Sequence, residues 1–143
     1  MKLSSRGRYA VMALADMAKV PSDKPMSLKG ISLRQGISLQ YLEQLFLKLK
    51  RKEIVYSIRG PHGGYKLSKK PEDIKLSIIF SAVEEEIKTI KCNKKSKRSC
   101  NGKSIKCITH YLWDEVEILI NTFFDNKSLK DVLDINNKMG RIH

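Results

Sequence analysis

The three cysteines are the residues best suited to carry chemistry in this chain. Cys92, Cys100 and Cys107 are its only cysteines, and all three lie in one short segment. Three thiols cannot all pair within one chain, and clustered thiols in a reducing compartment indicate metal ligation or redox chemistry rather than structural disulfides. A thiol-dependent enzyme or redox carrier is a second interpretation, but the sequence has no CxxC motif and no evident partner base. We therefore predict no catalytic residues and no enzyme.

The segment around the cysteines has few residues that can form a core. Between Glu84 and Lys106 it is rich in lysine and poor in large apolar side chains. Such a segment is too polar to pack by itself, and we expect a loop that an external group organises. A metal is the simplest organiser. Zinc, or free thiols that sense peroxide or nitric oxide directly, stay open as alternatives.

The charge of the chain favours a polyanionic partner. The sequence holds 28 Lys and Arg against 15 Asp and Glu, a formal net charge of +13. Nucleic acid or an anionic membrane surface fits this excess. The apolar stretch 10–15 is too short for a signal peptide, because Arg6 and Arg8 precede it and Asp16 closes it. No run is long enough to cross a membrane, so we expect a cytoplasmic protein.

The first half of the chain has the pattern of a helix-turn-helix. A largely apolar segment over 9–18 predicts a first helix, Ser27 is a candidate N-cap for a second, and Gly36 suits the turn that ends it. Ser38 is a candidate cap for a third helix over 39–52. One face of this third helix is apolar, and its other face carries Gln40, Tyr41, Gln44 and Lys48. Those groups suit the reading of base edges and phosphates, although a solvated amphipathic helix would show the same pattern.

A hairpin with a glycine-rich tip follows the third helix. Residues 54–58 and 65–67 read as two strands, and 59–64 reads as the turn between them. Because Gly60 has no side chain, the chain there can approach the sugar-phosphate backbone of DNA closely. The positive charge of Arg59 suits a narrow minor groove, where the negative potential is strongest. We expect a wing beside the reading helix, with His62 as a minor contact.

The second half predicts three further helices. A short amphipathic helix is expected from about Ile74 to Val83, and a long one begins near Ile108, with apolar residues at helical spacing for about 20 residues. A helix this apolar needs two partners, its own domain and the same helix of a second subunit, unless it is simply a core helix. Ser128 and Asp131 have the spacing of a capping box for a last short helix, and we expect fraying after Asn136.

Several motifs in order give the chain a family resemblance. They are Arg6-Gly7-Arg8-Tyr9-Ala10, Gln35-Gly36-Ile37-Ser38, Tyr41-Leu42-Glu43-Gln44-Leu45, Arg59-Gly60-Pro61 to Tyr65, Ser81-Ala82-Val83 and Thr109-His110-Tyr111-Leu112-Trp113. With them the chain resembles the IscR family of iron-sulfur cluster regulators from residue 1 to about residue 136. The resemblance implies a mainly α fold with a small β-hairpin wing, in which a winged helix-turn-helix domain precedes a long dimerisation helix. It also implies a homodimeric transcription repressor that binds double-stranded operator DNA, carries a 2Fe-2S cluster and controls cluster-assembly genes.

The resemblance also implies a ligand set and a division of the chain. The cluster ligands would be Cys92, Cys100, Cys107 and His110, and both gaps between cysteines are longer than is usual in the family. Three thiolates and an imidazole suit iron, although zinc accepts the same set. We expect a DNA-binding domain over 1–75, a short helix with the cysteine-rich loop over 76–106, the dimerisation helix with a short helix over 107–136, and a tail over 137–143.

The DNA-binding residues follow from the reading helix, the wing and the first motif. We expect Arg6 and Arg8 to touch the DNA backbone and Arg59 to enter the minor groove. A carboxylate at Glu43 either accepts a hydrogen bond from cytosine or repels phosphate, so it restricts the permitted sequences. We hypothesise that cluster loading changes whether Glu43 opposes certain operators. The full expected set is Arg6, Arg8, Ser38, Gln40, Tyr41, Glu43, Gln44, Arg59 and Gly60.

Overall fold

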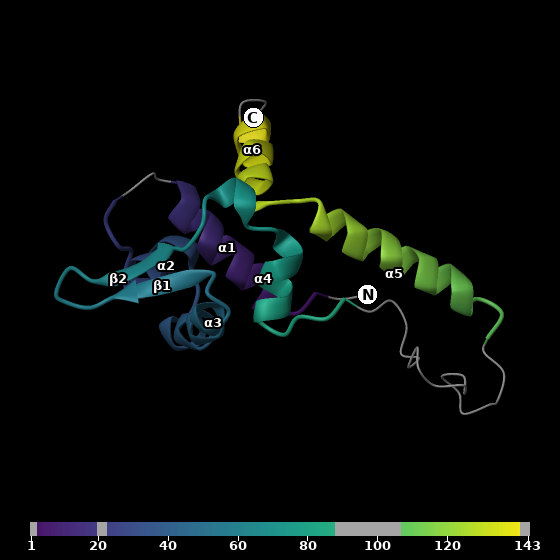
Figure 1. Ribbon diagram of the computed structural model, residues 1–143, viewed down its shortest axis with the longest axis horizontal. Coiled ribbons are helices and arrows are strands. Elements are labelled where there is room, and N and C mark those ends of the chain that lie inside the picture. The colour runs from purple at the N-terminus through teal and green to yellow at the C-terminus, as the bar shows by residue number, and fades with distance from the viewer. Residues whose placement is uncertain (1–2, 20–22, 88–106, 141–143) are drawn as a thin grey trace.

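The computed structural model describes residues 3–19, 23–87 and 107–140. Its elements in chain order are α1 (Ser5–Lys19), α2 (Leu28–Gln35), α3 (Leu39–Arg51), β1 (Val55–Ile58), β2 (Gly64–Leu67), the 3-10 helix η1 (Pro71–Asp73), α4 (Leu76–Ala82), α5 (His110–Asp125) and α6 (Leu129–Gly140). The expected mainly α fold with a small β wing is confirmed. α1 to α4 and the hairpin form one packed body, from which α5 and α6 extend in different directions (Figure 1).

Local capping interactions fix the helix-turn-helix. The Ser27 hydroxyl accepts a hydrogen bond of 3.1 Å from the Gly30 amide, and the Ser38 hydroxyl accepts one from the Tyr41 amide at 3.4 Å. Between them, Gly36 ends α2 with a φ of 66°, a left-handed conformation that other residues adopt at a cost. The predicted caps and turn of α2 and α3 are therefore confirmed.

The apolar faces of the first three helices meet in one core. α3 buries the four apolar residues that its periodicity predicts, and α1 and α2 pack against them. The largest fully buried side chains include Leu14, Ile31, Leu42, Phe46 and Leu49. This shared core holds α3 with its polar face outward.

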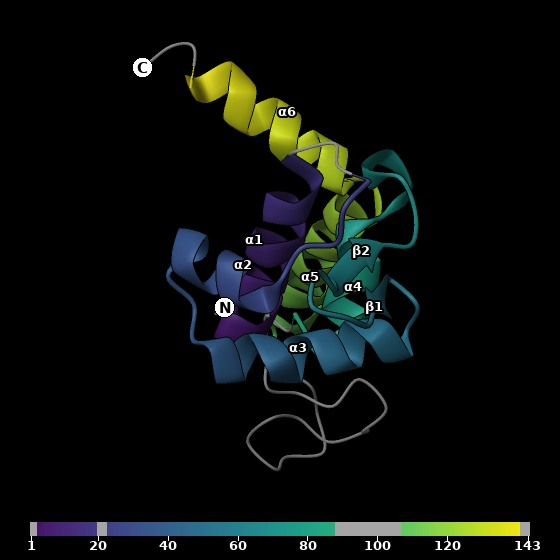
Figure 2. The same cartoon turned by 90° about the vertical axis from the view of Figure 1, so that its left-hand side faces the viewer.

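The hairpin is docked on the same body. β1 and β2 pair antiparallel with Val55 opposite Leu67, and the Tyr65 ring lies 5.0 Å from the Phe46 ring of α3. Tyr65 also exchanges two backbone hydrogen bonds with Met26, of 2.8 and 2.9 Å. The wing is thereby tied to both α3 and the chain that enters α2, and Figure 2 shows α3 and the hairpin sharing one side of the molecule.

The last two helices differ from each other in their contacts. α5 packs on α4 through Phe124, whose ring meets the Phe80 ring edge to face at 4.8 Å. α6 packs on α1 and begins with the predicted capping box, in which the Ser128 amide donates to Asp131 Oδ2 at 2.8 Å. α6 continues to Gly140, past Asn136, where we expected fraying, because helix-compatible spacing of apolar residues persists to Met139. No helix among the described residues is long and apolar enough to cross a membrane.

Candidate DNA-binding surface and cysteine site

The first two turns of α3 present most of the predicted reading residues to solvent. Ser38, Gln40, Glu43 and Gln44 are exposed. Tyr41 is half-buried, because its hydroxyl lies 2.9 Å from the Ser5 hydroxyl and its ring packs on Tyr9. Amides and a carboxylate thus stand together on the outer face of α3, where a base edge can be read.

The predicted backbone contacts lie beside this face, on α1 and on the wing. Arg6 and Arg8 are exposed in the first turn of α1, and Arg59 and Gly60 are exposed in the turn between β1 and β2. The turn is held by the Gly63 amide, which donates to the Gly60 carbonyl at 2.9 Å. Three separate elements, α1, α3 and the wing, therefore supply the exposed residues that the sequence analysis assigns to DNA.

A buried carboxylate fixes the angle between α1 and α2. Asp16 is 8% exposed and accepts hydrogen bonds from Arg34 Nε at 3.1 Å and Nη2 at 2.8 Å, and from Gln35 Nε2 at 2.9 Å. Burial raises the pKa of Asp16, but these hydrogen bonds outweigh it and hold the pKa below its usual value. In the sequence, Asp16 is only the residue that ends an apolar stretch. Its hydrogen bonds could not be predicted, because its partners lie 18 and 19 residues away.

A second buried carboxylate holds the start of α1. Glu85 is 8% exposed, and its carboxylate accepts hydrogen bonds from the Ser4 amide at 2.8 Å, the Gly7 amide at 3.3 Å and the Ser4 hydroxyl. Burial raises the pKa of Glu85, and the hydrogen bonds from Ser4 and Gly7 outweigh it, so the pKa is lowered. Glu85 follows α4 closely in the chain, so it joins the region that leads toward the cysteines to the first turn of α1.

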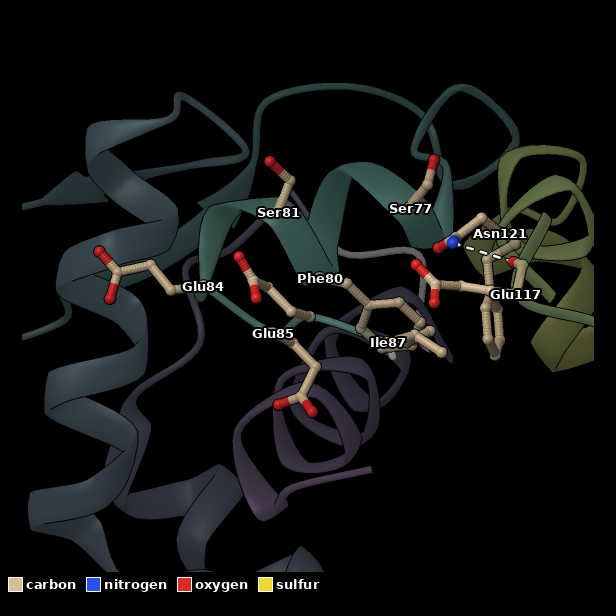
Figure 3. Close-up of a pocket in the computed structure, with 10 residues that line it drawn as sticks. Ser77, Phe80, Ser81, Glu84, Glu85, Ile87, Glu117 and Asn121 are labelled. Carbon is tan, nitrogen blue, oxygen red and sulfur yellow. Dashed lines mark hydrogen bonds between the residues drawn. The ribbon is translucent and has the colours of Figure 1, made fainter. Parts of the chain in front are cut away.

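The neighbouring cleft is acidic. It has a volume of about 490 Å³ and lies between α4, the residues that follow it, and α5 (Figure 3). Its lining includes Glu84, Glu85, Glu86 and Glu117, together with Phe80 and Phe124. The lining carboxylates make this cleft acidic, in contrast to the exposed cations of α1 and the wing.

Two of the four predicted cluster ligands lie in neighbouring positions at the start of α5. Cys107 is half-buried, and its carbonyl accepts a hydrogen bond of 3.0 Å from the His110 amide. The His110 side chain is buried, and its Nδ1 atom has no hydrogen-bond partner among the described residues. Cys92 and Cys100 lie outside the described residues, and the described part of the chain contains no group of three metal-ligating side chains.

One face of α5 is apolar and open to solvent. Its large apolar side chains are between 41% and 73% exposed, and they are Tyr111, Leu112, Trp113, Ile118, Leu119 and Phe123. An exposed apolar face of this size is typical of interaction surfaces. The alternative of a simple core helix does not fit this exposure.

Comparisons with known proteins agree with this architecture. The family model Rrf2, described as an iron-dependent transcriptional regulator, matches residues 3–135. The HTH-type transcriptional regulator IscR of Aliivibrio salmonicida is 44% identical over 142 residues, which cover 99% of this chain and 82% of that protein. The sequence resemblance to IscR is therefore confirmed.

Two solved structures share the fold. T. potens IscR has a TM-score of 0.74 at 33% identity, with 95% of this chain and 88% of that chain covered. CymR, the global cysteine regulator of B. subtilis, has a TM-score of 0.78 at 28% identity, with 94% and 98% covered. The relatives are regulators and not enzymes, and this chain belongs to the Rrf2 family of DNA-binding, iron-dependent transcriptional regulators.

Proposed function

We propose that this chain is a homodimeric regulator that senses iron-sulfur cluster status through a bound 2Fe-2S cluster and controls cluster-assembly genes in the cytoplasm. The observation that carries the proposal is the buried His110 imidazole, whose Nδ1 has no hydrogen-bond partner among the described residues, three positions after Cys107 at the start of α5. The names of the relatives add support, because T. potens IscR and the IscR of A. salmonicida match nearly the whole chain.

The chemistry of the donor set fits a metal group. A buried ring nitrogen without a hydrogen-bond partner is unfavourable by about 1–3 kcal/mol, and His110 Nδ1 is in this position among the described residues. A metal bond to Nδ1 would give this nitrogen the partner that it lacks, and it would fix the tautomer of the imidazole. Cys92, Cys100, Cys107 and His110 would hold the cluster, which supplies one-electron redox chemistry and sensitivity to iron supply when bound.

The DNA contacts divide by chemistry. Gln40 and Gln44 offer amides to base edges, while Ser38, Tyr41, Arg6, Arg8 and Gly60 would position the protein on the sugar-phosphate backbone. Arg59 would enter the minor groove from the wing. The exposure of these residues on α1, α3 and the wing supports this division. Tyr41 is the half-buried member, and only the part of its side chain that Ser5 leaves exposed could contact DNA.

The exposed face of α5 suits a second copy of this chain. Burial of one large apolar side chain stabilises an association by roughly 1.5–3 kcal/mol, and six such side chains stand on this helix. An isologous contact would pair the helix with itself and place two copies of α3 for two half-sites. Leu119→Lys is expected to turn a dimer into a monomer in sedimentation equilibrium. Leu33→Lys, at an exposed apolar residue of α2, is the matched control; a dimer that survives Leu119→Lys contradicts the interface.

Glu43 is the residue through which cluster status would alter operator choice. It is exposed on α3 between Gln40 and Gln44, so its carboxylate faces the same DNA as the two amides. Glu43→Ala is expected to bind additional operators when the cluster is absent, measured by operator binding with and without cluster. If Glu43→Ala binds every operator like the parent in both states, this role is wrong.

The cluster is tested by anaerobic purification with iron and sulfide analysis and visible absorption. We expect a coloured protein with about two irons and two sulfides per chain, and loss of the colour in Cys92→Ala and Cys107→Ala, with a shifted spectrum or loss in His110→Ala. His62→Ala, at the exposed histidine of the wing tip, is the matched control and should keep the cluster. A colourless protein with stoichiometric zinc would contradict the cluster while leaving the DNA-binding assignment in place.

A further inference from the structure

An ion pair joins α3 to the turn that follows α4. Lys48 Nζ lies 2.8 Å from Glu84 Oε2, and Figure 3 shows the Glu84 side chain at the edge of the cleft, extending toward α3. Lys48 stands one helical turn after Gln44, on the side of α3 that also carries Gln40 and Tyr41. The sequence pattern places Lys48 among the polar groups of α3 that suit base edges and phosphates, but it gives no sign of the ion pair with Glu84.

The charges of two further cations act on the same carboxylate. The hydrogen bond from Lys48 is the largest cause that lowers the pKa of Glu84, and the charges of Arg6 on α1 and Arg51 on α3 lower it further. Arg6 and Arg51 are exposed, and Arg6 is already a predicted backbone contact. Lys48 is thus the direct partner of Glu84, while Arg6, whose Nε lies 4.0 Å from Oε2 of the neighbouring Glu85, and Arg51 act through the local field, which favours negative charge here.

The pair contributes little to folding stability. Glu84 has a φ of 60°, a left-handed conformation that is unfavourable for a residue with a side chain. The side chain of Glu84 is 70% exposed, and solvent screens the attraction within an exposed ion pair.

We propose that Lys48 is a DNA phosphate contact and that Glu84 competes with the phosphate for it from within the chain. While the pair is closed, Lys48 is neutralised and contributes little to DNA binding. Movement of the turn at Glu84 frees the lysine for a phosphate. The inference rests on the proposed use of α3 in DNA binding and adds to it a residue and an internal competitor.

The test uses the full chain and a fluorescent mixed-sequence DNA duplex, with affinity measured by anisotropy over a range of salt concentrations. Glu84→Gln keeps the size of the side chain and removes its charge. We expect it to tighten binding by up to about fivefold at low salt, the upper end of what one exposed ion pair contributes. The salt dependence should also steepen by about 0.9 in log–log slope, as one added phosphate contact requires.

Three comparisons make the result specific. Lys48→Gln should weaken binding slightly and abolish the effect of Glu84→Gln in the double variant. Lys48→Arg, in place of Lys48→Gln, should restore the effect of Glu84→Gln on affinity, because the guanidinium also binds phosphate. Glu72→Gln, which removes one exposed carboxylate from η1, should change affinity less than Glu84→Gln and leave the slope unchanged.

The outcomes distinguish a failure of this inference from a failure of the proposed function. Unchanged affinity and slope in Glu84→Gln overturn the inference while DNA binding by the parent stands. An effect that persists in the double variant, or that Glu72→Gln reproduces, shows a general charge effect and overturns it as well. A parent protein without salt-dependent duplex binding contradicts the proposed function and the inference together.

Discussion

The contact between Gly7 and the end of α4 gives the most specific prediction about the fold. Gly7 is buried within α1, and a Cβ atom placed on it would lie 2.9 Å from Glu85 Cγ and 2.9 Å from Phe80 Cδ1. Neither neighbour can withdraw easily. Glu85 is held by Ser4 and by the Gly7 amide, and the Phe80 ring packs edge to face on Phe124 at 4.8 Å.

Two opposing effects set the magnitude for Gly7→Ala. Replacement of a helical glycine by alanine normally stabilises by about 1 kcal/mol, and overpacking of a closed site costs about 1–3 kcal/mol. We expect the steric cost to be larger, because two neighbours must move. The free energy of unfolding should fall by about 1 kcal/mol, which lowers the melting temperature by about 3 °C in a chain of this size.

The assay is thermal unfolding by circular dichroism, with Gly140→Ala as the control. Gly140 is the last residue of α6 and has no atom within 4 Å of an added Cβ. Its replacement should leave the melting temperature unchanged or slightly higher. A Gly7→Ala protein as stable as the parent, or more stable, would refute the packing of Glu85 and Phe80 against the start of α1.

Three further predictions concern the elements that position α3 and the wing. Asp16→Ala should lower the free energy of unfolding by about 2 kcal/mol in urea denaturation, since Arg34 and Gln35 lose their hydrogen bonds to the buried carboxylate and only the half-exposed Arg34 is readily solvated instead; a change below experimental error would contradict this contact between α1 and α2. The pKa of Asp16 is lowered in the folded state, so its contribution to folding stability is complete above its unfolded pKa of about 4 and is lost as the pH falls below that value. The melting temperature should therefore fall less steeply between pH 7 and pH 3 in Asp16→Asn than in the parent, and an equal fall in both proteins would be evidence against this contribution. Gly64→Ala should destabilise the wing by more than about 1 kcal/mol and weaken DNA binding, because the φ of Gly64 is 156° and an added Cβ would lie 2.3 Å from the Met26 carbonyl oxygen. A variant with the stability and DNA affinity of the parent would show that the wing does not pack against Met26 in this way.

Local signals explain why much of the fold could be predicted from the sequence. Ser27, Gly36 and Ser38 act on residues within a few positions of themselves, and their capping roles follow from residue type and spacing. The hairpin is also local, because a glycine-rich turn joins two short strands. The long exposed face of α5 follows from an excess of apolar residues over what one domain can cover.

The interactions that position the site could not be predicted in this way. Glu85 accepts from Ser4 and Gly7, which lie 81 and 78 residues away, and no pattern in either segment names the other. Tyr41 has the position of a reading residue on α3, yet its hydroxyl is held by Ser5 of α1. Such contacts depend on which helices the core brings together, which is a property of the tertiary structure.

The most direct test of the account is selection from a library of random-sequence duplexes by the anaerobically purified protein, with Gln44→Ala measured in parallel. We predict that the parent enriches a motif with two half-sites, that Gln44→Ala relaxes or changes one position in each half-site, and that removal of the cluster alters the enriched set. Absence of any enriched motif, or an identical motif from Gln44→Ala, would contradict the central claim that α3 of this chain reads operator DNA.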